Sequence, residues 1–190
     1  MQNADSVLYR LNSELCILHY AFLLPFELQP TLTGPLIELR PLREDDFDAL
    51  FAVASDPLIW ALHPERDRYT EPVFRRFFSG AIESGGAFLV LDRRDGRVIG
   101  SSRFAEYDER NSEIEIGWTF LARSHWGGTY NGEMKLLMLT HAFRFVRRVI
   151  FRVGPDNHRS RRALDKIGAT YVGQENHPER GEFVVYEMTP

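Results

Sequence analysis

The chain has 190 residues, of which 44% are hydrophobic and 13% aromatic, and its formal net charge at neutral pH is −4. Length and composition predict a single globular domain. The negative charge argues against nucleic acid as a partner, because phosphate contacts need a basic surface. The only cysteine, Cys16, excludes an intramolecular disulfide, and the six histidines lack the spacing of metal ligands. We therefore expect a cytoplasmic protein that binds no metal and no nucleic acid.

Residues 1–34 differ in pattern from the rest of the chain. Apolar residues at helical spacing predict an amphipathic helix that ends before Pro25, namely Leu8, Leu11, Leu15, Leu18 and Phe22. The apolar core of this segment, residues 16–26, is shorter than the ~20 residues that cross a bilayer, so we expect no membrane partner. We interpret residues 1–34 as an N-terminal extension without a chemical role, followed by one domain over residues 35–190.

Hydrophobic periodicity then predicts strands and helices in chain order. A first strand over residues 36–40 precedes a helix from Glu44 to Asp56 and a second helix between Thr70 and Gly85. The remaining elements are strands over 87–92, 97–107 and 112–120, a helix over 133–146, a strand over 149–153, a helix over 159–167, and strands over 171–172 and 182–188. This order predicts an α+β fold, with helices on both faces of a mixed sheet.

The segment between the strand over 112–120 and the helix over 133–146 is a candidate anion site. It contains Trp126–Gly132, a glycine-containing loop that leads into a helix start. The free N–H groups of a first helical turn and the helix dipole attract anions there. The loop lacks the Lys-Ser/Thr ending of nucleoside-triphosphate loops and the three-glycine spacing of dinucleotide folds. The pattern therefore favours a pyrophosphate ligand other than ATP or NAD.

Three motifs at this element order resemble the GNAT superfamily of acyl-CoA-dependent N-acetyltransferases. They are Glu115-Ile116-Gly117-Trp118 on a strand, Trp126-Gly127 in the loop, and Val153–Gly168, which includes Asn157 and Ser160. The branch that the chain resembles most is that of the ribosomal-protein N-terminal acetyltransferases, over residues 36–188. The resemblance implies a mostly antiparallel central sheet of about seven strands in a three-layer α/β/α arrangement. It also implies acetyl-CoA as co-substrate.

The chain departs from the superfamily pattern at two points. The loop usually reads Arg/Gln-x-x-Gly-x-Gly/Ala, whereas here Ser124, Gly127 and Thr129 stand at those positions. Thr129 has less backbone freedom than glycine, so we expect a different loop shape. The superfamily's frequent tyrosine acid is replaced by Leu164, and the branch offers Ser160 instead.

The resemblance assigns the cofactor-binding residues. The helix start and loop hold the pyrophosphate, the strand edge pairs with the pantetheine arm, and the next helix contributes polar groups. These residues are Trp118, Thr119, Phe120, Trp126, Gly127, Gly128, Thr129, Tyr130, Asn131, Gly132, Asn157, Ser160 and Arg161. Arg159 and Arg162 are alternatives to Arg161, and all three also fit a solvated basic helix face. Asn157 fits a helix N-cap equally well.

Two carboxylates are candidates for the general base. Glu113 and Glu115 alternate with apolar residues, so they share one face of the strand. We expect Glu115 to be the base and Glu113 to be second; the alternative is that both face solvent. The resemblance alone makes Ser160 the acid for the leaving thiolate. Trp60 and Tyr69, together with Glu115, are the predicted acceptor-binding residues, although aromatic residues more often fill a core.

These observations predict an N-acetyltransferase that moves an acetyl group from acetyl-CoA directly to a primary amine in a ternary complex. The acceptor is a protein N-terminal α-amine, or a small molecule such as an amino acid, a polyamine or an antibiotic. A non-catalytic acyl-CoA-binding sensor is a further alternative. The sequence leaves open whether the protein is a monomer or a homodimer.

Overall fold

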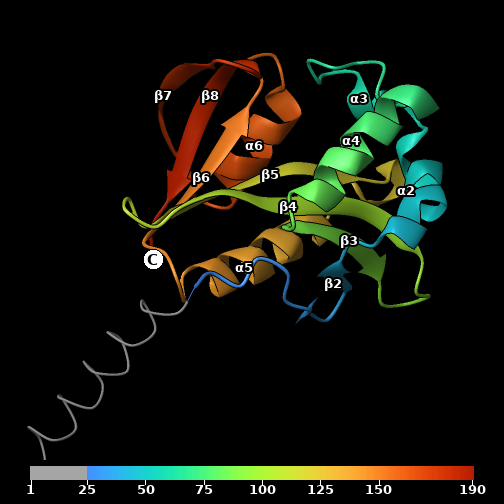
Figure 1. The fold of residues 1–190 in the computed structure, drawn as a ribbon, viewed down its shortest axis with the longest axis horizontal. Helices are drawn as coiled ribbons and strands as arrows, with labels where there is room; N and C mark the ends of the chain where they lie inside the picture. The colour runs from blue at the N-terminus through green and yellow to red at the C-terminus, as the bar shows by residue number, and fades with distance from the viewer. Residues whose placement is uncertain (1–24) are drawn as a thin grey trace, which may run out of the picture.

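The structure is a computed structural model that describes residues 25–190. The helix predicted before Pro25 lies outside the described residues. One sheet of eight strands organises this part of the chain (Figure 1). The strands are β1 (Leu32–Thr33), β2 (Ile37–Pro41), β3 (Ala87–Asp92), β4 (Val98–Asp108), β5 (Glu113–Leu121), β6 (Arg148–Val153), β7 (Thr170–His177) and β8 (Gly181–Met188). The α-helices are α2 (Phe47–Ala54), α3 (Pro57–Trp60), α4 (Glu71–Glu83), α5 (Tyr130–Ala142) and α6 (His158–Lys166).

The sheet has the order β1-β2-β3-β4-β5-β6-β8-β7. All neighbouring strands are antiparallel except β5 and β6, which run parallel because α5 connects them. The predicted α+β fold with a mixed, mostly antiparallel sheet is therefore confirmed. The strand beyond the predicted seven is β1, whose two residues are too few to produce a periodic pattern.

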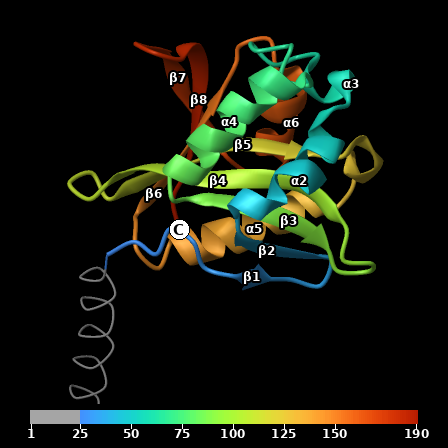
Figure 2. The ribbon, with the colours of Figure 1, turned by 45° about the vertical axis from the view of Figure 1, so that its right-hand side comes forward.

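Two hydrophobic cores lie on opposite faces of the sheet, which gives the predicted three layers (Figure 2). On one face, α2, α3 and α4 pack an aromatic core that includes Trp60, Phe74 and Phe120. On the other face, α5 places Met134 and Met138 against the sheet, and Leu164 of α6 belongs to the same cluster. β5 contributes to both cores, because its successive side chains point to opposite faces.

Residues 26–34 pack onto the domain, although the sequence places them in the N-terminal extension. Phe26 is 7% exposed and its ring contacts Phe104 edge-on at 5.1 Å. The side chain of Gln29 donates a hydrogen bond to the carbonyl of Ala87, and the backbone of Glu27 accepts one from His141. These contacts move the N-terminal edge of the packed domain from residue 35 to at least Phe26.

Several helix boundaries differ from the prediction: α5 ends at Ala142 rather than at residue 146, and a 3-10 turn over Glu44–Asp46 precedes α2. α5 begins at Tyr130 rather than at residue 133, because the loop before it already has helical backbone angles at Thr129. Asp56 and Pro57 end α2 as expected, but they also begin α3: the Asp56 carboxylate accepts a hydrogen bond from the N–H of Leu58. Proline fits the first position of a helix, where its missing N–H costs nothing.

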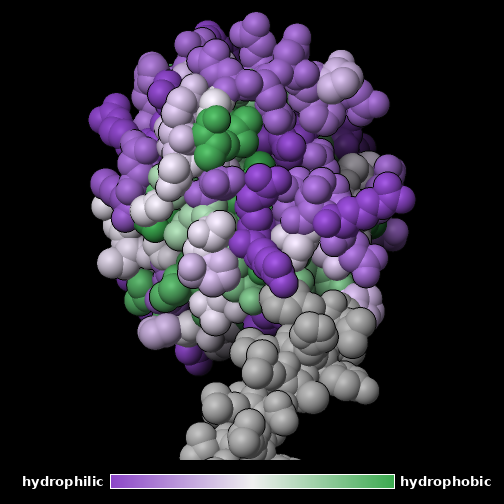
Figure 3. All heavy atoms as spheres, turned by 90° about the vertical axis from the view of Figure 1, so that its left-hand side faces the viewer, coloured by the Kyte–Doolittle hydropathy of each residue, from purple (hydrophilic) through white to green (hydrophobic). Residues whose placement is uncertain are grey.

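β7 forms one edge of the sheet. The face of the molecule that carries it is mostly hydrophilic, with a few small hydrophobic areas (Figure 3). Polar side chains along an edge strand discourage pairing with another chain. Within residues 25–190, no helix is long and apolar enough to cross a membrane.

Candidate active site

The site begins where β5 and β6 separate. The two strands pair with each other only at Glu113–Glu115, which lie opposite Arg148–Ile150. Both strands continue beyond that point, but no longer paired with each other. From Ile116 onward, the backbone groups of β5 that face β6 therefore have no partner in that strand. This separation leaves one edge of β5 free for a ligand.

A cavity of about 540 Å³ follows this edge. It runs along β5 from Glu115 to Leu121 and on to Trp126, and this stretch of strand spans about 20 Å. Its polar, aromatic and glycine lining includes Trp60, His63, Arg68, Glu115, Gly117, Trp118, Thr119, Phe120, Trp126, Gly127, Asn131, Lys135, Arg152, Asn157, Arg159, Ser160 and Arg180. Following the roles that the resemblance implies, we call the part near Trp126 and Asn131 the cofactor end and the part near Glu115 the acceptor end.

Trp118 lies between the two ends in an unusual backbone conformation. Its φ is +51°, in the left-handed region that favours glycine, and the register between β4 and β5 shifts at this point. Such irregularities re-aim side chains and occur next to active sites. Trp118 lies in the cavity wall, and the guanidinium groups of Arg103 and Arg180 contact its ring.

A buried carboxylate fixes the loop at the cofactor end. Asp92, at the end of β3, is 1% exposed and accepts hydrogen bonds from His125 at 3.1 Å and from the Tyr130 hydroxyl at 3.3 Å. Gly127 has a φ of +70°, which explains the glycine there, whereas Thr129 has ordinary helical angles. The loop therefore needs no glycine at Thr129, and α5 presents its free N–H groups to the cavity at Asn131.

Lys135 is the one lysine in the cavity wall. It lies on α5, is 5% exposed, and donates a hydrogen bond at 2.7 Å to the Thr119 hydroxyl of β5. The Thr119 hydroxyl in turn lies 2.8 Å from that of Ser102. No carboxylate among residues 25–190 pairs with Lys135, and burial lowers the pKa of its ammonium to about 7. The lysine is thus close to half-protonated at neutral pH.

The polar groups of α6 complete the cofactor end. Asn157 caps the helix: its side-chain oxygen accepts a hydrogen bond from the N–H of Ser160 at 3.1 Å. Arg159 reaches across to α3, where it donates to the carbonyl of Ile59 at 2.8 Å, and its guanidinium lies 3.9 Å from the centre of the Trp126 ring. α6, α3 and the loop before α5 are therefore linked by one side chain.

Glu115 dominates the acceptor end. It is 2% exposed, and its Oε2 accepts hydrogen bonds from Arg152 at 2.7 Å and from Arg180 at 3.0 Å. Its Oε1 receives only a long contact, 3.4 Å from Arg180. A Cβ on Gly117 would lie 3.0 Å from this Oε1, so the glycine leaves space beside the oxygen that is less engaged.

Two further acidic side chains extend this ion-pair network. Arg152 also pairs with Glu106 and Glu175, and Arg180 also pairs with Glu106. Burial alone would lower the pKa of Arg152, but these carboxylates raise it above its usual value. The network therefore keeps the Arg152 guanidinium charged and fixed beside Glu115.

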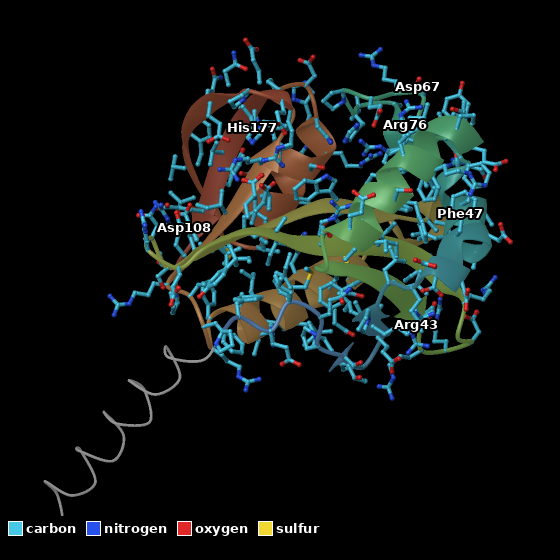
Figure 4. The ribbon with its side chains drawn as sticks, in the orientation of Figure 1. Arg43, Phe47, Asp67, Arg76, Asp108 and His177 are labelled. Carbon is cyan, nitrogen blue, oxygen red and sulfur yellow. The ribbon has the colours of Figure 1, made fainter. Side chains whose placement is uncertain are left out.

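The segment between α3 and α4 closes the acceptor end from the other side. Arg68 is bound by Glu65 through two hydrogen bonds, and it lies 3.2 Å from Nε2 of His63. Burial and the positive charge of Arg68 lower the pKa of His63 to about 3, so this imidazole is a weak base. Figure 4 labels Asp67 in this segment and His177 on β7.

Most of the predicted site residues lie around the cavity. Those that line it are Glu115, Trp60, Trp118, Thr119, Phe120, Trp126, Gly127, Asn131, Asn157 and Ser160. Trp60 also fills the core, where it is 3% exposed and donates a hydrogen bond to the carbonyl of Ala54. Trp60 is therefore both a core residue and part of the cavity wall, and Asn157 is both an N-cap and part of that wall.

The other predicted site residues do not line the cavity. Glu113 pairs with Arg148 at the closed end of the β5–β6 gap. Tyr69 is 39% exposed outside the cavity, and Arg161 contacts the Tyr186 hydroxyl and the carbonyl of Pro155 instead of the cofactor end. Gly128 and Thr129 in the loop, and Tyr130 and Gly132 in the first turn of α5, do not line the cavity either.

Apart from Arg159, sequence reasoning missed the lysine and arginine residues of the cavity. Lys135 is a charged residue within a largely apolar stretch of helix, and this is the sequence feature that could have identified it as a candidate site residue. Arg152 and Arg180 lie in β6 and in the β7–β8 turn, more than 30 residues from Glu115, so only the fold reveals that they meet. Within the described residues, no group of three His, Cys, Asp or Glu side chains is arranged to hold a metal ion.

Comparison with known proteins agrees with this geometry. The sequence matches the acetyltransferase (GNAT) domain family over residues 37–170. The chain belongs to the GNAT acetyltransferase family. This GNAT domain is therefore that of an acyl-CoA-dependent N-acetyltransferase, with acetyl-CoA as its co-substrate. The free edge of β5 and the exposed start of α5 fit an extended ligand that carries phosphates.

Three relatives illustrate the similarity. An uncharacterized N-acetyltransferase, p20, from Bacillus licheniformis is 26% identical over 144 residues, which are 72% of this chain and 80% of p20. The structure of Mycobacterium smegmatis RimJ in complex with CoA-disulfide is 20% identical, with a TM-score of 0.65 and coverage of 84% of this chain and 87% of RimJ. A structure described as a ribosomal-protein-serine acetyltransferase from Vibrio cholerae is 15% identical, with a TM-score of 0.72. The match covers 86% of this chain and 99% of the Vibrio cholerae chain.

Proposed function

We propose that this GNAT enzyme transfers the acetyl group directly to a primary amine, with both substrates bound in the one cavity. The observation that carries the proposal is the gap between β5 and β6. It joins a helix start suited to phosphate to a buried carboxylate through a cavity that follows about 20 Å of β5. A continuous cavity of this length supports direct transfer, because neither substrate has to leave before the other binds.

Glu115 is the proposed base. An amine must lose a proton before it attacks a carbonyl carbon, and Glu115 Oε1 is the buried carboxylate oxygen with the fewest hydrogen bonds at the acceptor end. Gly117 leaves room beside that oxygen for the amine or for one water molecule. A base positioned in this way contributes about 10²–10⁴ in rate. His63 is a poorer candidate because its pKa is about 3.

Acetyl-CoA supplies the acetyl group as a thioester, so the departing sulfur needs a proton. Ser160 and Lys135 both line the cavity and could each donate one. The Lys135 ammonium, with a pKa of about 7, is a stronger acid than a thiol with a pKa of ~8.5 and can therefore protonate a thiolate. The free N–H groups on the edge of β5 would stabilise the negative charge that develops on the carbonyl oxygen.

Two classes of acceptor fit a GNAT enzyme of this kind. The fold that the chain shares with the Vibrio cholerae ribosomal-protein-serine acetyltransferase supports the N-terminal α-amine of a protein. The enclosed ion-pair network at the acceptor end supports a small amine instead. The proposal also includes a location in the cytoplasm, a monomeric or homodimeric state, and an N-terminal extension over residues 1–34.

The test is turnover by the purified full chain. Release of the CoA thiol would be measured with acetyl-CoA and two acceptor sets, small primary amines and short peptides with free N-termini. Thermal unfolding with and without acetyl-CoA serves as the control for cofactor binding. A saturating ligand at ~100 times its dissociation constant stabilises by about 2.7 kcal/mol, so binding is visible even without turnover. Binding of acetyl-CoA without thiol release above the hydrolysis rate for any amine would contradict the proposal.

A further inference from the structure

One buried cation beside the acceptor end has no hydrogen-bond partner among residues 25–190, and it lies behind the residues that line the cavity. Arg103, on β4, is 7% exposed, and its Nε is fully enclosed without a hydrogen bond. Among residues 25–190, no oxygen accepts a hydrogen bond from any nitrogen of this guanidinium. Burial lowers the pKa of Arg103 to about 10, which still leaves the group positively charged at neutral pH. A buried charge without hydrogen bonds is costly, so a folded protein rarely retains one without a use.

The other buried guanidinium groups near the cavity each donate hydrogen bonds through at least one nitrogen, although the Nε of Arg180 is, like that of Arg103, enclosed without one. Arg68 donates to Glu65, Arg152 and Arg180 donate to Glu115, and Arg159 donates to a backbone carbonyl. Arg103 instead lies against two rings, with its guanidinium carbon 4.7 Å from the centre of Trp118 and 5.8 Å from that of Phe77. These rings attract the cation, but they leave its five N–H donors unused.

Arg103 also lies where three guanidinium groups converge. The Trp118 ring, which lines the cavity, has Arg180 at 5.0 Å in addition to Arg103, and the Phe77 ring has Arg68 at 4.6 Å. Besides burial, the positive charges of Arg68 and Arg180 lower the pKa of Arg103, whereas the negative charge of Glu115 raises it. Arg68 and Arg180 have side chains in the cavity wall, so a ligand at the acceptor end meets them first.

We propose that the acceptor amine carries a carboxylate or phosphate group, which Arg103 binds while the amine lies beside Glu115. The planar fork of a guanidinium matches these oxyanions with two parallel hydrogen bonds. A group that reaches so enclosed a guanidinium must be small, so the acceptor is a compact zwitterionic amine of the amino-acid kind. This inference rests on the proposed acetyl transfer, and it names the substrate class of that site.

The charges at the acceptor end suit both parts of such a molecule. Glu115 Oε1 is available to the ammonium group, and the N–H donors of Arg103 are available to the oxyanion. A neutral amine would leave Arg103 as it is, buried and without a hydrogen bond. The same site should therefore reject a matched amine that lacks the negative charge.

The experiment compares matched acceptors with the purified full chain and acetyl-CoA. Each L-amino acid is paired with its α-amide, and 2-aminoethyl phosphate is paired with ethanolamine. A peptide of neutral residues with an amidated C-terminus represents protein N-termini. We expect the kcat/KM of the best anionic member to exceed that of its neutral partner about 10- to 100-fold. The two kinds of pair distinguish a carboxylate from a phosphate.

Variants at position 103 test whether this arginine is responsible. Arg103→Met should reduce the preference for the anionic member to about twofold or less, while the thermal shift with acetyl-CoA stays unchanged. Because an apolar side chain replaces an unpaired buried charge, the variant should unfold at the same or a higher temperature. Arg103→Lys keeps the charge without the fork, so it should retain part of the preference. Arg110→Met, in the exposed turn after β4, should behave like the unaltered chain.

Several results would overturn the inference. They are equal turnover of anionic and neutral members, a preference for the amidated peptide, and an Arg103→Met variant that unfolds several degrees lower yet keeps the preference. Acceptor binding, measured as thermal stabilisation in the presence of CoA, separates this inference from the proposed function. Preferential binding of anionic amines without turnover would support anion recognition and contradict acetyl transfer. Turnover without any preference for anionic amines would support acetyl transfer and contradict anion recognition.

Discussion

The two ends of the cavity are built from different chemistry. At the cofactor end, the groups that face the ligand are backbone N–H groups at the start of α5 and along the free edge of β5, with Lys135 as an added cation. At the acceptor end, they are charged side chains, with Glu115 held by Arg152 and Arg180. Backbone groups recognise a phosphate whatever the local side chains are. Side chains recognise a particular acceptor, so specificity resides at the acceptor end.

The largest expected effect comes from breaking the acceptor end alone. Glu115→Gln keeps the shape of the side chain but removes its charge and its capacity to accept a proton. We expect kcat to fall about 10²- to 10⁴-fold, while acetyl-CoA still raises the temperature of unfolding. Steady-state thiol release and thermal unfolding measure the two properties.

Glu113→Gln is the matched control, because Glu113 lies on the same strand but pairs with Arg148 at the closed end of the gap. Its activity should change less than about threefold, as is usual for a side chain that does not touch the reacting atoms. An equal loss of activity in both variants would mean that the reaction depends on the negative charge of the strand and not on a base at Glu115.

The same contrast explains what the sequence could predict. The cofactor end depends on local features, such as Gly127, the helix start and the strand before them, and a local pattern in the sequence reports local structure. The acceptor end depends on side chains from β4, β5, β6 and the β7–β8 turn, which come together only through the order of strands in the sheet. Glu115 could be named from its strand, but its partners could not.

The alternation of side chains along β5 does not predict which of its two carboxylates lines the cavity. Glu113 and Glu115 do share a face of β5, yet only Glu115 lines the cavity, at the last position where β5 pairs with β6. The sequence shows the face but not the position at which two strands separate. Arg161 differs from its prediction for a similar reason: in α6 the neighbouring Arg159 and Ser160 face the cavity, and Arg161 points to Tyr186.

The second prediction concerns the single lysine of the cofactor end. The folded protein lowers the pKa of Lys135 to about 7, whereas the unfolded chain has the ordinary value of 10.5. Between these values the unfolded state binds more protons than the folded state, so folding becomes more favourable as pH rises. The gain is at most about 1.4 kcal/mol per pH unit, or about 4 kcal/mol from pH 7 to pH 10.

Lys135→Met removes this dependence and provides the control. Chemical denaturation of both proteins between pH 7 and pH 10 would show the free energy of unfolding of the unaltered chain rising relative to that of the variant. Parallel curves would mean that the ammonium has an ordinary pKa and a route to water. In that case Lys135 would also lose its advantage over Ser160 as the proton donor.

The third prediction concerns a substitution that disturbs the cofactor end and leaves the acceptor end unchanged. Gly127 has a φ of +70°, so Gly127→Ala places a Cβ in a conformation that costs about 1–2 kcal/mol, although no atom obstructs it. We expect the loop to relax and the dissociation constant of acetyl-CoA to rise about tenfold, with kcat at saturation changed little. Titration of thermal stabilisation with acetyl-CoA measures this. A loss confined to kcat would place the loop's contribution in the chemical step.

The smallest effect should come from a glycine outside both ends. Gly80 lies in α4 without a positive φ, and no atom lies within 4 Å of the place that a Cβ would occupy, so alanine fits there. Gly80→Ala should stabilise the fold by about 0.5–1 kcal/mol, because alanine loses less backbone freedom in a helix. Its kcat/KM and its acetyl-CoA shift should both match those of the unaltered chain. If this variant also altered cofactor binding, the two ends could not be treated as separate units, because α4 packs against Phe120 on β5 and would then transmit changes to both.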